Sequence, residues 1–287
     1  MTAPVDPPLR ILAPQGRAAP VIVASPHSGR DYTAEFLRMS RLDAHALRRS
    51  EDCYVEQLCE GSMGQGATML HATFPRAYCD VNREAWELDP TMFRDPLPHW
   101  CNTTSSKVRA GFGTIARIVS RDGPIYPRPL PFSEAETRIR TCWQPYHDTL
   151  SRLVQACRDQ HGCCILLDAH SMPTPQGRGE MPDFVLGNAW GTSCTAELTA
   201  LVEDVLSGHG YTVARNVPFA GGYVTRHYGR PRRGVQALQL EISRGLYMDQ
   251  DSLEPHAGFV SLQAVLTDLF ATIAQYGDLL ARQVAAE

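Results

Sequence analysis

The chain has 287 residues, of which 43% are hydrophobic and 20% are charged, and its formal net charge is −4. This length suffices for one large α/β domain or two small ones with a substantial core. Charges of both signs are scattered along the chain, which argues against a nucleic-acid or membrane surface. No uninterrupted apolar stretch long enough for a membrane span and no signal peptide is recognisable, so we expect a soluble cytoplasmic protein.

Short apolar runs alternate with longer amphipathic segments, which is the pattern of helices packed on a sheet. The predicted strands are residues 20–25, 67–74, 164–168, 184–187, 211–214 and 237–242. The predicted helices are residues 42–59, 134–158, 195–206 and 259–283, and Ser133 with Glu136 indicates a capping box for the second. Residues 85–132 show little periodicity, and so long a loop favours a segment that covers a site. We find no linker and predict one domain, 1–287.

Nine cysteines occur at irregular positions, and no CxxC pair is present. The neighbours Cys163 and Cys164 point to opposite faces of a predicted strand, so they are poor disulfide partners. We therefore expect buried free thiols, with neither a disulfide framework nor a cysteine zinc site.

Polar residues follow or interrupt three of the predicted strands. His27 comes directly after residues 20–25, Asp168 and His170 end the apolar run CCILLDAH, and Glu241 lies inside LQLEIS. Because functional side chains of α/β sheets collect at the carboxyl ends of strands, these residues are candidates for one site. Two histidines and a carboxylate are usual ligands of catalytic zinc, with a further carboxylate as general base, and Glu241 suits the latter role. The alternatives are structural histidines and an ion pair between Glu241 and Arg244.

Two arginine-containing segments, DVNREAW and GGYVTRHYGRP, indicate an anionic substrate, because guanidinium groups bind carboxylates through paired hydrogen bonds. The alternative is ordinary surface arginines. GFGTIA, residues 111–116, is no dinucleotide motif, since neither a buried strand precedes it nor an acid follows at the required distance. Ser171 adjoins His170 along the strand and points away from it, so a serine nucleophile is disfavoured.

Nine short segments, taken in order, resemble the motifs of the N-formylglutamate amidohydrolase (N-formylglutamate deformylase) family. They are SPHSGRDY, EDCYVEQL, FPRAYCDVNRE, GFGTIARIVSRDGPIY, PYHDTL, LLDAHSMP, DFVLGN, PFAGGYVTRHYGRP and LQLEISRGLYMD. The resemblance covers most of the chain. It implies a three-layer α/β sandwich similar to zinc carboxypeptidases, with a central mixed, mostly parallel sheet flanked by helices. It also implies hydrolysis of N-formyl-L-glutamate to formate and L-glutamate late in histidine degradation.

The resemblance implies one zinc ion held by His27, by Asp52 in EDCYVEQL and by His170, with Glu51 as the alternative acid. Zinc carboxypeptidases take their acid three residues after the first histidine, where this chain has Arg30, so a distant acid must replace it.

The implied catalytic residue is Glu241, the general base for a zinc-activated water. A small dicarboxylate substrate would meet Asn82 and Arg83 with one carboxylate, and Thr225, Arg226 and Arg244 with the other. Asp168 is a candidate for orienting a ligand.

Three alternatives to this function remain from the sequence. The same site could act on another N-acyl amino acid or on a small carboxylate-bearing peptide. The protein could be a non-catalytic metal or anion-binding module, which would not need Glu241. It could also be a structural protein whose polar strand ends satisfy one another and bind no metal.

Overall fold

The computed structural model describes residues 8–119, 123–174 and 181–286. These residues form two compact units. The first takes the described residues of Met1–Arg10, Pro26–Cys53 and His71–Thr149, and the second takes those of Ile11–Ser25, Tyr54–Leu70 and Leu150–Glu287. The chain crosses between the units several times, so neither is a continuous stretch of sequence. The prediction of one domain stays a prediction.

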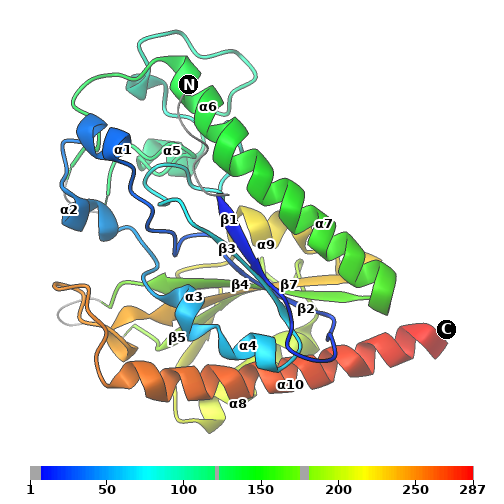
Figure 1. The fold of residues 1–287 in the computed structure, drawn as a ribbon. Coiled ribbons are helices and arrows are strands. Elements are labelled where there is room, and N and C mark those ends of the chain that lie inside the picture. Colours follow the sequence, from blue (N-terminus) through cyan, green and yellow to red (C-terminus); the bar gives the residue numbers. More distant parts are fainter. Residues whose placement is uncertain (1–7, 120–122, 175–180, 287) are drawn as a thin grey trace. The chain divides into compact units, whose positions relative to one another are not determined.

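A seven-stranded sheet, most of which lies in the second unit, has the order β1-β3-β2-β4-β7-β5-β6 (Figure 1). Its strands are β1 (Leu9–Leu12), β2 (Val21–Ser25), β3 (Thr68–Ala72), β4 (Cys164–Met172), β5 (Phe184–Gly187), β6 (Val213–Arg215) and β7 (Val235–Ser243). β2 pairs parallel with β4 and β4 with β7, whereas β5 runs antiparallel to β7. The predicted mixed, mostly parallel sheet is confirmed for these strands. The central strands β2, β4 and β7 are buried along their whole length. β2 up to Ala24 and the first four residues of β4 are continuously apolar, as expected for strands covered on both faces, whereas the rest of β4 and β7 contain buried polar residues.

The helices are α1 (Ala34–Met39), α2 (Ala44–Arg48), α3 (Val55–Leu58), α4 (Gly61–Gly64), α5 (Ser106–Arg109), α6 (Phe132–Arg138), α7 (Gln144–His161), α8 (Ala196–Gly208), α9 (Tyr223–Tyr228) and α10 (Gly258–Ala286). The long helices are α7, α8 and α10, and the others are short. Single turns of 3₁₀ helix occur at Pro90–Met92, Pro231–Arg233 and Arg244–Leu246, and a π turn, Ile139–Trp143, joins α6 to α7.

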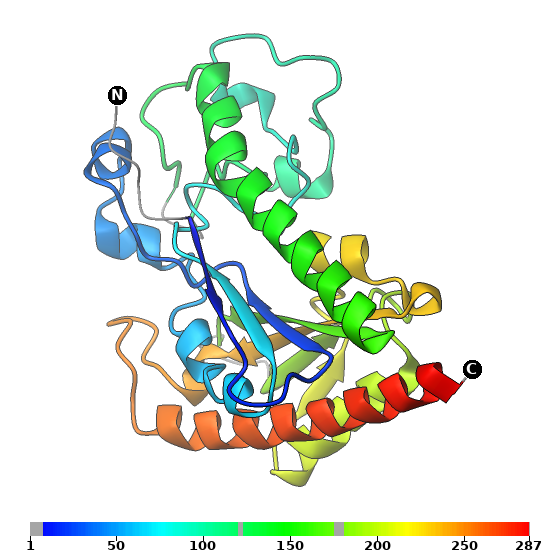
Figure 2. The ribbon, with the colours of Figure 1, turned by 45° about the vertical axis from the view of Figure 1, so that its right-hand side comes forward.

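Within the second unit, helices cover both faces of the sheet (Figures 1 and 2). α10 packs against α3, α4 and α8, and its Gly277 lies close to Pro20 and Ile165, where a larger side chain would collide with the proline ring. α9 packs against β4 and β7, where Thr225 contacts Asp168. Since alternate strand residues point to opposite faces, Ile165 faces α10, whereas Asp168 and His170 face α9. The predicted layered α/β architecture is therefore confirmed, and its polar residues gather under α9.

Among the described residues, α10 alone is long and apolar enough, by length and composition, to cross a membrane. The sequence showed no uninterrupted apolar stretch, because Asp268 and Asp278 divide this helix. Leu262, Leu266, Leu269, Phe270 and Ile273 are buried along one side of α10, as in a helix that covers a sheet.

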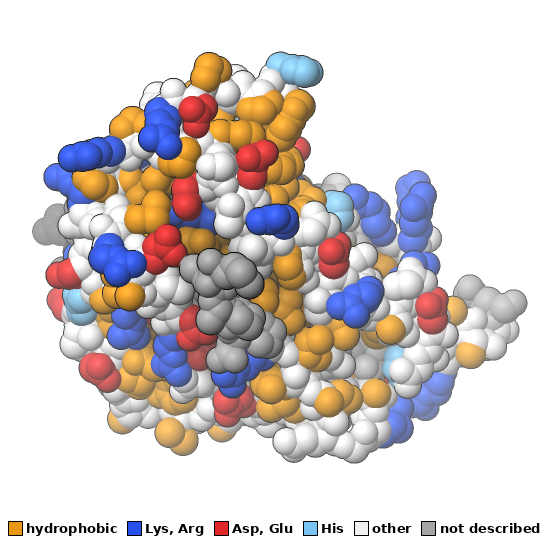
Figure 3. Space-filling model, turned by 45° about the horizontal axis from the view of Figure 1, so that its top comes forward, with side chains coloured by type: hydrophobic (Ala, Val, Ile, Leu, Met, Phe, Trp, Pro, Cys, Tyr) orange, Lys and Arg blue, Asp and Glu red, His pale blue; other side chains and the backbone are white. Residues whose placement is uncertain are grey.

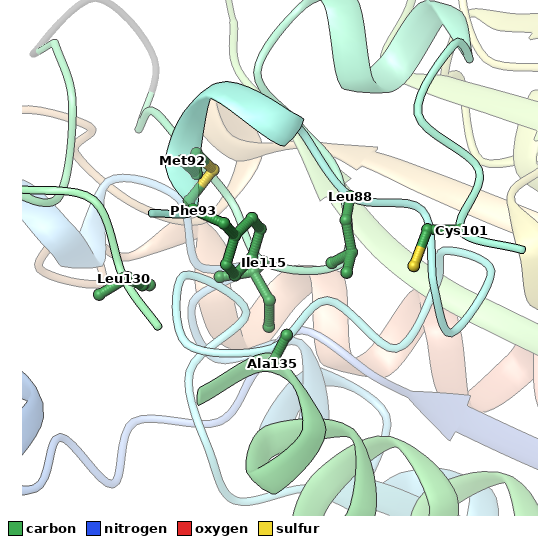
Figure 4. Close-up of a cluster of buried hydrophobic side chains, with 7 residues drawn as sticks. All are labelled: Leu88, Met92, Phe93, Cys101, Ile115, Leu130 and Ala135. Carbon is green, nitrogen blue, oxygen red and sulfur yellow. The ribbon is translucent and has the colours of Figure 1, made fainter. Parts of the chain in front are cut away.

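In the first unit, the long aperiodic segment 85–132 builds a hydrophobic core of its own (Figure 4). Its buried side chains pack with Ala135 of α6, and they are Leu88, Met92, Phe93, Cys101, Ile115 and Leu130. Isolated bridges join Glu87 to Asn102 and Phe93 to Leu130. The segment is thus held by side-chain burial and scattered backbone pairs, which leave no regular period in the sequence. That it covers a site stays a prediction.

Two predicted helical features are wrong. Residues 42–59 form two short helices, because the backbone N–H of Asp52 donates to the carbonyl of His27 and so leaves the helical pattern. Tyr54 then adopts a positive φ of 63°, which a helix does not tolerate. The capping box is also wrong, since α6 begins at Phe132, whose N–H donates to the Asp95 carboxylate. The other predicted helices and strands are found, most of them with shifted ends, and β1 was not predicted.

All nine cysteines lie among the described residues and none forms a disulfide, as predicted. Burial raises the pKa of the Cys142 and Cys163 thiols to about 11. On the face shown in Figure 3, the described acidic and basic side chains lie interspersed among hydrophobic ones.

Candidate active site

The predicted site residues divide between the two compact units. His27, Asp52, Asn82 and Arg83 belong to the first unit, and His170, Glu241, Thr225, Arg226 and Arg244 belong to the second. Each unit presents its own buried cluster of histidine and carboxylate.

In the first unit, His27 is buried two residues after the end of β2. The next glycine, Gly29, allows the chain to pass against the backbone of Thr73 and Phe74, because a Cβ there would collide with the Phe74 carbonyl. The SPHSG motif therefore combines a chemically useful histidine with a glycine that the close approach requires.

The carboxylate of Asp52 lies beside His27, with Oδ2 3.3 Å from Nδ1 of the imidazole. The neighbouring Glu51 makes different contacts, because its Oε2 accepts from the Arg48 guanidinium at 3.3 Å and from the Cys53 thiol at 3.2 Å. Burial raises the pKa of Glu51, and a hydrogen bond with Tyr32 and the charge of Arg48 oppose that shift. Asp52, rather than Glu51, is therefore the acid of this pair that contacts His27.

Asp80 contacts the other nitrogen of the same imidazole, since its Oδ1 lies 2.7 Å from Nε2 of His27. Its Oδ2 accepts from the Arg76 guanidinium at 2.8 Å, and Nη2 of Arg83 lies 3.8 Å away. Burial alone would raise the pKa of this carboxyl, but the charges of Arg83, His27 and Arg76 outweigh it and hold the pKa well below its usual range. Asp80 is therefore an anion at neutral pH.

Arg83 is fixed at the rim of this cluster. Its Nε donates to the Phe112 carbonyl at 2.9 Å, and its Nη1 donates to the Asn82 carbonyl at 2.8 Å. The backbone N–H of Asn82 donates to Asp80 at 2.9 Å, so the turn that carries both residues is tied to that carboxylate. Two backbone anchors leave Nη2 of Arg83, near Asp80, as the nitrogen best able to bind a further anion.

In the second unit, His170 and Glu241 are partners in the parallel register of β4 and β7. β4 runs four residues beyond its predicted end, so His170 lies inside the strand and its backbone is held by the sheet. Asp168 precedes it on the same face, and its Oδ1 lies 3.0 Å from Nε2 of His170. Gln239 donates to Oε1 of Glu241 at 2.6 Å. Two adjacent strands thus display a histidine and a glutamate side by side, each with a polar neighbour.

The remaining predicted residues surround this pair. The Thr225 hydroxyl is buried in α9 and lies 3.3 Å from Asp168 and 3.4 Å from Gln239. Nε of Arg244, just after β7, donates to the Ser171 hydroxyl at 3.0 Å. The Arg226 side chain is exposed and donates to the Gly221 carbonyl. Their contacts with a substrate stay predictions.

Sequence reasoning missed Arg76 and Gln239 as members of these clusters. Gln239 had a usable signal, because it stands two residues before Glu241 in the same strand and so shares its face. Arg76 stands four residues before its partner Asp80, but its other partner, Asp52, belongs to a distant segment that local sequence does not connect with it.

Buried histidine and carboxylate groups at or near the carboxyl ends of strands in a mixed sheet are typical of α/β enzymes. A family model for N-formylglutamate amidohydrolase matches residues 19–248, so the chain belongs to that family. The family predicted from the sequence motifs is thereby confirmed.

Individual relatives agree with this assignment. The chain is 30% identical over 269 residues to an N-formylglutamate deformylase of Pseudomonas aeruginosa, covering 90% of this chain and 94% of the relative. It is 29% identical over 242 residues to one of Pseudomonas putida, covering 82% and 84%. The crystal structure of N-formylglutamate amidohydrolase from Ralstonia eutropha JMP134 is 38% identical, with a TM-score of 0.89 over 94% of this chain and 98% of that one. The predicted likeness to zinc carboxypeptidases stays a prediction.

Proposed function

We propose that this protein hydrolyses the amide bond of N-formyl-L-glutamate to give formate and L-glutamate. The observation that carries the proposal is the extent of the family match, which spans residues 19–248 and so contains every predicted site residue. The relatives from both Pseudomonas species are named for this reaction, and each match covers more than four-fifths of both chains.

The proposed cofactor is one divalent metal ion, zinc, held by His27, Asp52 and His170. Two imidazoles and one carboxylate fit the donor set of catalytic zinc, which leaves a fourth position open. When bound, such an ion lowers the pKa of a coordinated water and polarises the oxygen of the amide to be cleaved.

Glu241 is the proposed general base. Its carboxylate takes a proton from the attacking water, whose oxygen forms a bond to the formyl carbon. Glu241 then gives that proton to the glutamate nitrogen as the C–N bond breaks, so the two products leave as formate and the free amino acid. The Gln239 amide, which donates to Oε1 of Glu241, keeps this side chain oriented along the sheet face of His170.

We propose that the arginines bind the two carboxylates of the substrate. We assign one carboxylate to Asn82 and Arg83 and the other to Thr225, Arg226 and Arg244. Each arginine is anchored through one nitrogen or more to a carbonyl or hydroxyl of the protein, which orients its remaining N–H groups. We further propose that the reaction takes place in the cytoplasm and belongs to histidine degradation.

The test is formate release by the purified protein from N-formyl-L-glutamate, compared with N-formyl-L-aspartate and with acetate release from N-acetyl-L-glutamate. We expect the highest kcat/KM with N-formyl-L-glutamate. Faster turnover of either analogue would assign the site to a different N-acyl amino acid, and no turnover of any of the three by protein that contains zinc would contradict the proposal.

A further inference from the structure

One carboxylate in the first unit, that of Asp80, contacts a predicted metal ligand without being a predicted ligand itself. It lies 2.7 Å from Nε2 of His27, and both side chains are buried. The Asn82 N–H and the Arg76 guanidinium both donate to this carboxylate, so it acts as an acceptor, and Nε2 of His27 is assigned as the donor in this contact. The lone pair of the imidazole is then on Nδ1, the nitrogen that faces Asp52 at 3.3 Å.

Asp80 is itself held rigidly. The N–H of Asn82 and the guanidinium of Arg76 donate to its two oxygens at 2.9 and 2.8 Å, and its own N–H donates to the Thr114 carbonyl at 2.8 Å. The groups that these contacts place around the Asp80 carboxylate are all hydrogen-bond donors. They favour the charged form of the carboxylate and fix the orientation of the side chain.

We propose that Asp80 is a positioning residue that fixes the tautomer and ring orientation of His27, so that Nδ1 of His27 is the ligating atom. The inference rests on the proposed function, because it needs His27 to bind the metal. It goes beyond that function in assigning the ligating nitrogen and the residue that selects it. Since the same carboxylate contacts the turn that carries Asn82 and Arg83, Asp80 also joins the metal-binding histidine to the predicted substrate-binding pair.

A carboxylate that accepts a hydrogen bond from the non-ligating nitrogen of a metal-binding histidine raises the basicity of the imidazole and prevents the ring from rotating. Loss of that carboxylate usually lowers metal affinity about 10- to 100-fold. The experiment is therefore a measurement of the zinc dissociation constant of the full chain by competition with a chromophoric chelator, with no substrate present. The variants are Asp80→Asn and Asp80→Ala, with unfolding followed in parallel by circular dichroism. Asp80→Asn is nearly isosteric and keeps an acceptor oxygen, so it guards against a variant that merely fails to fold.

Asp89 provides the matched control. It is also a buried aspartate of the first unit paired with an arginine, Arg117 Nε at 2.8 Å, and it caps the turn Pro90–Met92. Asp89→Asn therefore removes a comparable buried charge while His27 keeps its partner.

We expect zinc binding to weaken about 10- to 100-fold in Asp80→Ala and by a smaller factor in Asp80→Asn, while Asp89→Asn stays within about twofold of wild type. Folded Asp80 variants with the wild-type dissociation constant would overturn the inference alone. Wild-type protein that binds no zinc would overturn the proposed metal site and this inference with it.

Discussion

Replacing Glu241 with glutamine should lower the catalytic rate without changing folding or metal binding. In Glu241→Gln the new amide has the same shape as the carboxylate, and its oxygen can still accept the Gln239 N–H that Oε1 of Glu241 accepts at 2.6 Å. The pairing of β7 with β4 through His170 uses backbone atoms and is unaffected. The variant should therefore fold normally and bind zinc with the wild-type dissociation constant.

Loss of the general base should lower kcat about 10²- to 10⁴-fold, which corresponds to roughly 2.7–5.5 kcal/mol of transition-state stabilisation. The assay is initial-rate formate release at saturating N-formyl-L-glutamate, with zinc content measured on the same samples. Glu87→Gln is the control, because Glu87 is a buried carboxylate that accepts from the Ser105 hydroxyl in the first unit and has no proposed catalytic role. A kcat for Glu241→Gln within about threefold of wild type would refute the assignment of Glu241 as general base.

Three further predictions concern binding, stability and pH. Arg83→Ala should raise KM and lower kcat/KM about 10- to 100-fold with little change in kcat, as expected for a charge-assisted hydrogen bond made equally in ground and transition states; a fall confined to kcat would contradict this. Arg138→Met should lower the free energy of unfolding by about 2–4 kcal/mol in urea, because Arg138 is fully buried, donates to the Tyr126 hydroxyl and stacks on aromatic rings. Glu134→Gln should cost under about 1 kcal/mol, since Glu134 is partly exposed, and equal losses for the two variants would argue against this account of Arg138. The pKa of Glu51 is raised above 4.5 on folding, so folding retains a proton there and the contribution of Glu51 to stability falls as pH rises through the folded pKa. The stability difference between wild type and Glu51→Gln should therefore shift in favour of the variant as pH rises above 4.5, and a pH-independent difference would contradict the raised pKa.

Most strands of the sheet were predictable because their local sequence patterns identify them. β2, β4 and β7 each contain an apolar run that includes or precedes a polar residue. This pattern depends on local sequence alone, so it can be recognised without knowing the rest of the fold. The true end of β4 was not predictable, because Asp168 and His170 look like the start of a loop until the register with β7 is known.

The first unit was harder to predict, since its order depends on contacts between distant segments. Asp52 leaves the helical pattern because its N–H bonds to His27, and α6 begins at Phe132 because Asp95 caps it. Neither partner can be identified from local sequence. The core of residues 85–132 likewise draws its side chains from turns without a repeating period.

The chemical nature of the site could be inferred from the sequence more fully than its supporting contacts. His27, His170 and Glu241 stand out because burying such polar side chains in or beside a strand costs free energy unless they have partners. The family motifs contain all three. The contact of Asp80 with His27 emerges only when the loops are placed in space, whereas Gln239 stands two residues before Glu241 in one strand and could have been inferred as its neighbour.

The central claim is that hydrolysis depends on a single metal ion, and the most direct measurement is a reconstitution titration. Protein stripped with a chelator is mixed with increasing zinc, and the initial rate of formate release from N-formyl-L-glutamate is followed. We predict that stripped protein is inactive, that activity rises linearly and that it saturates at one zinc per chain. Full activity in protein shown to be free of metal would contradict the claim.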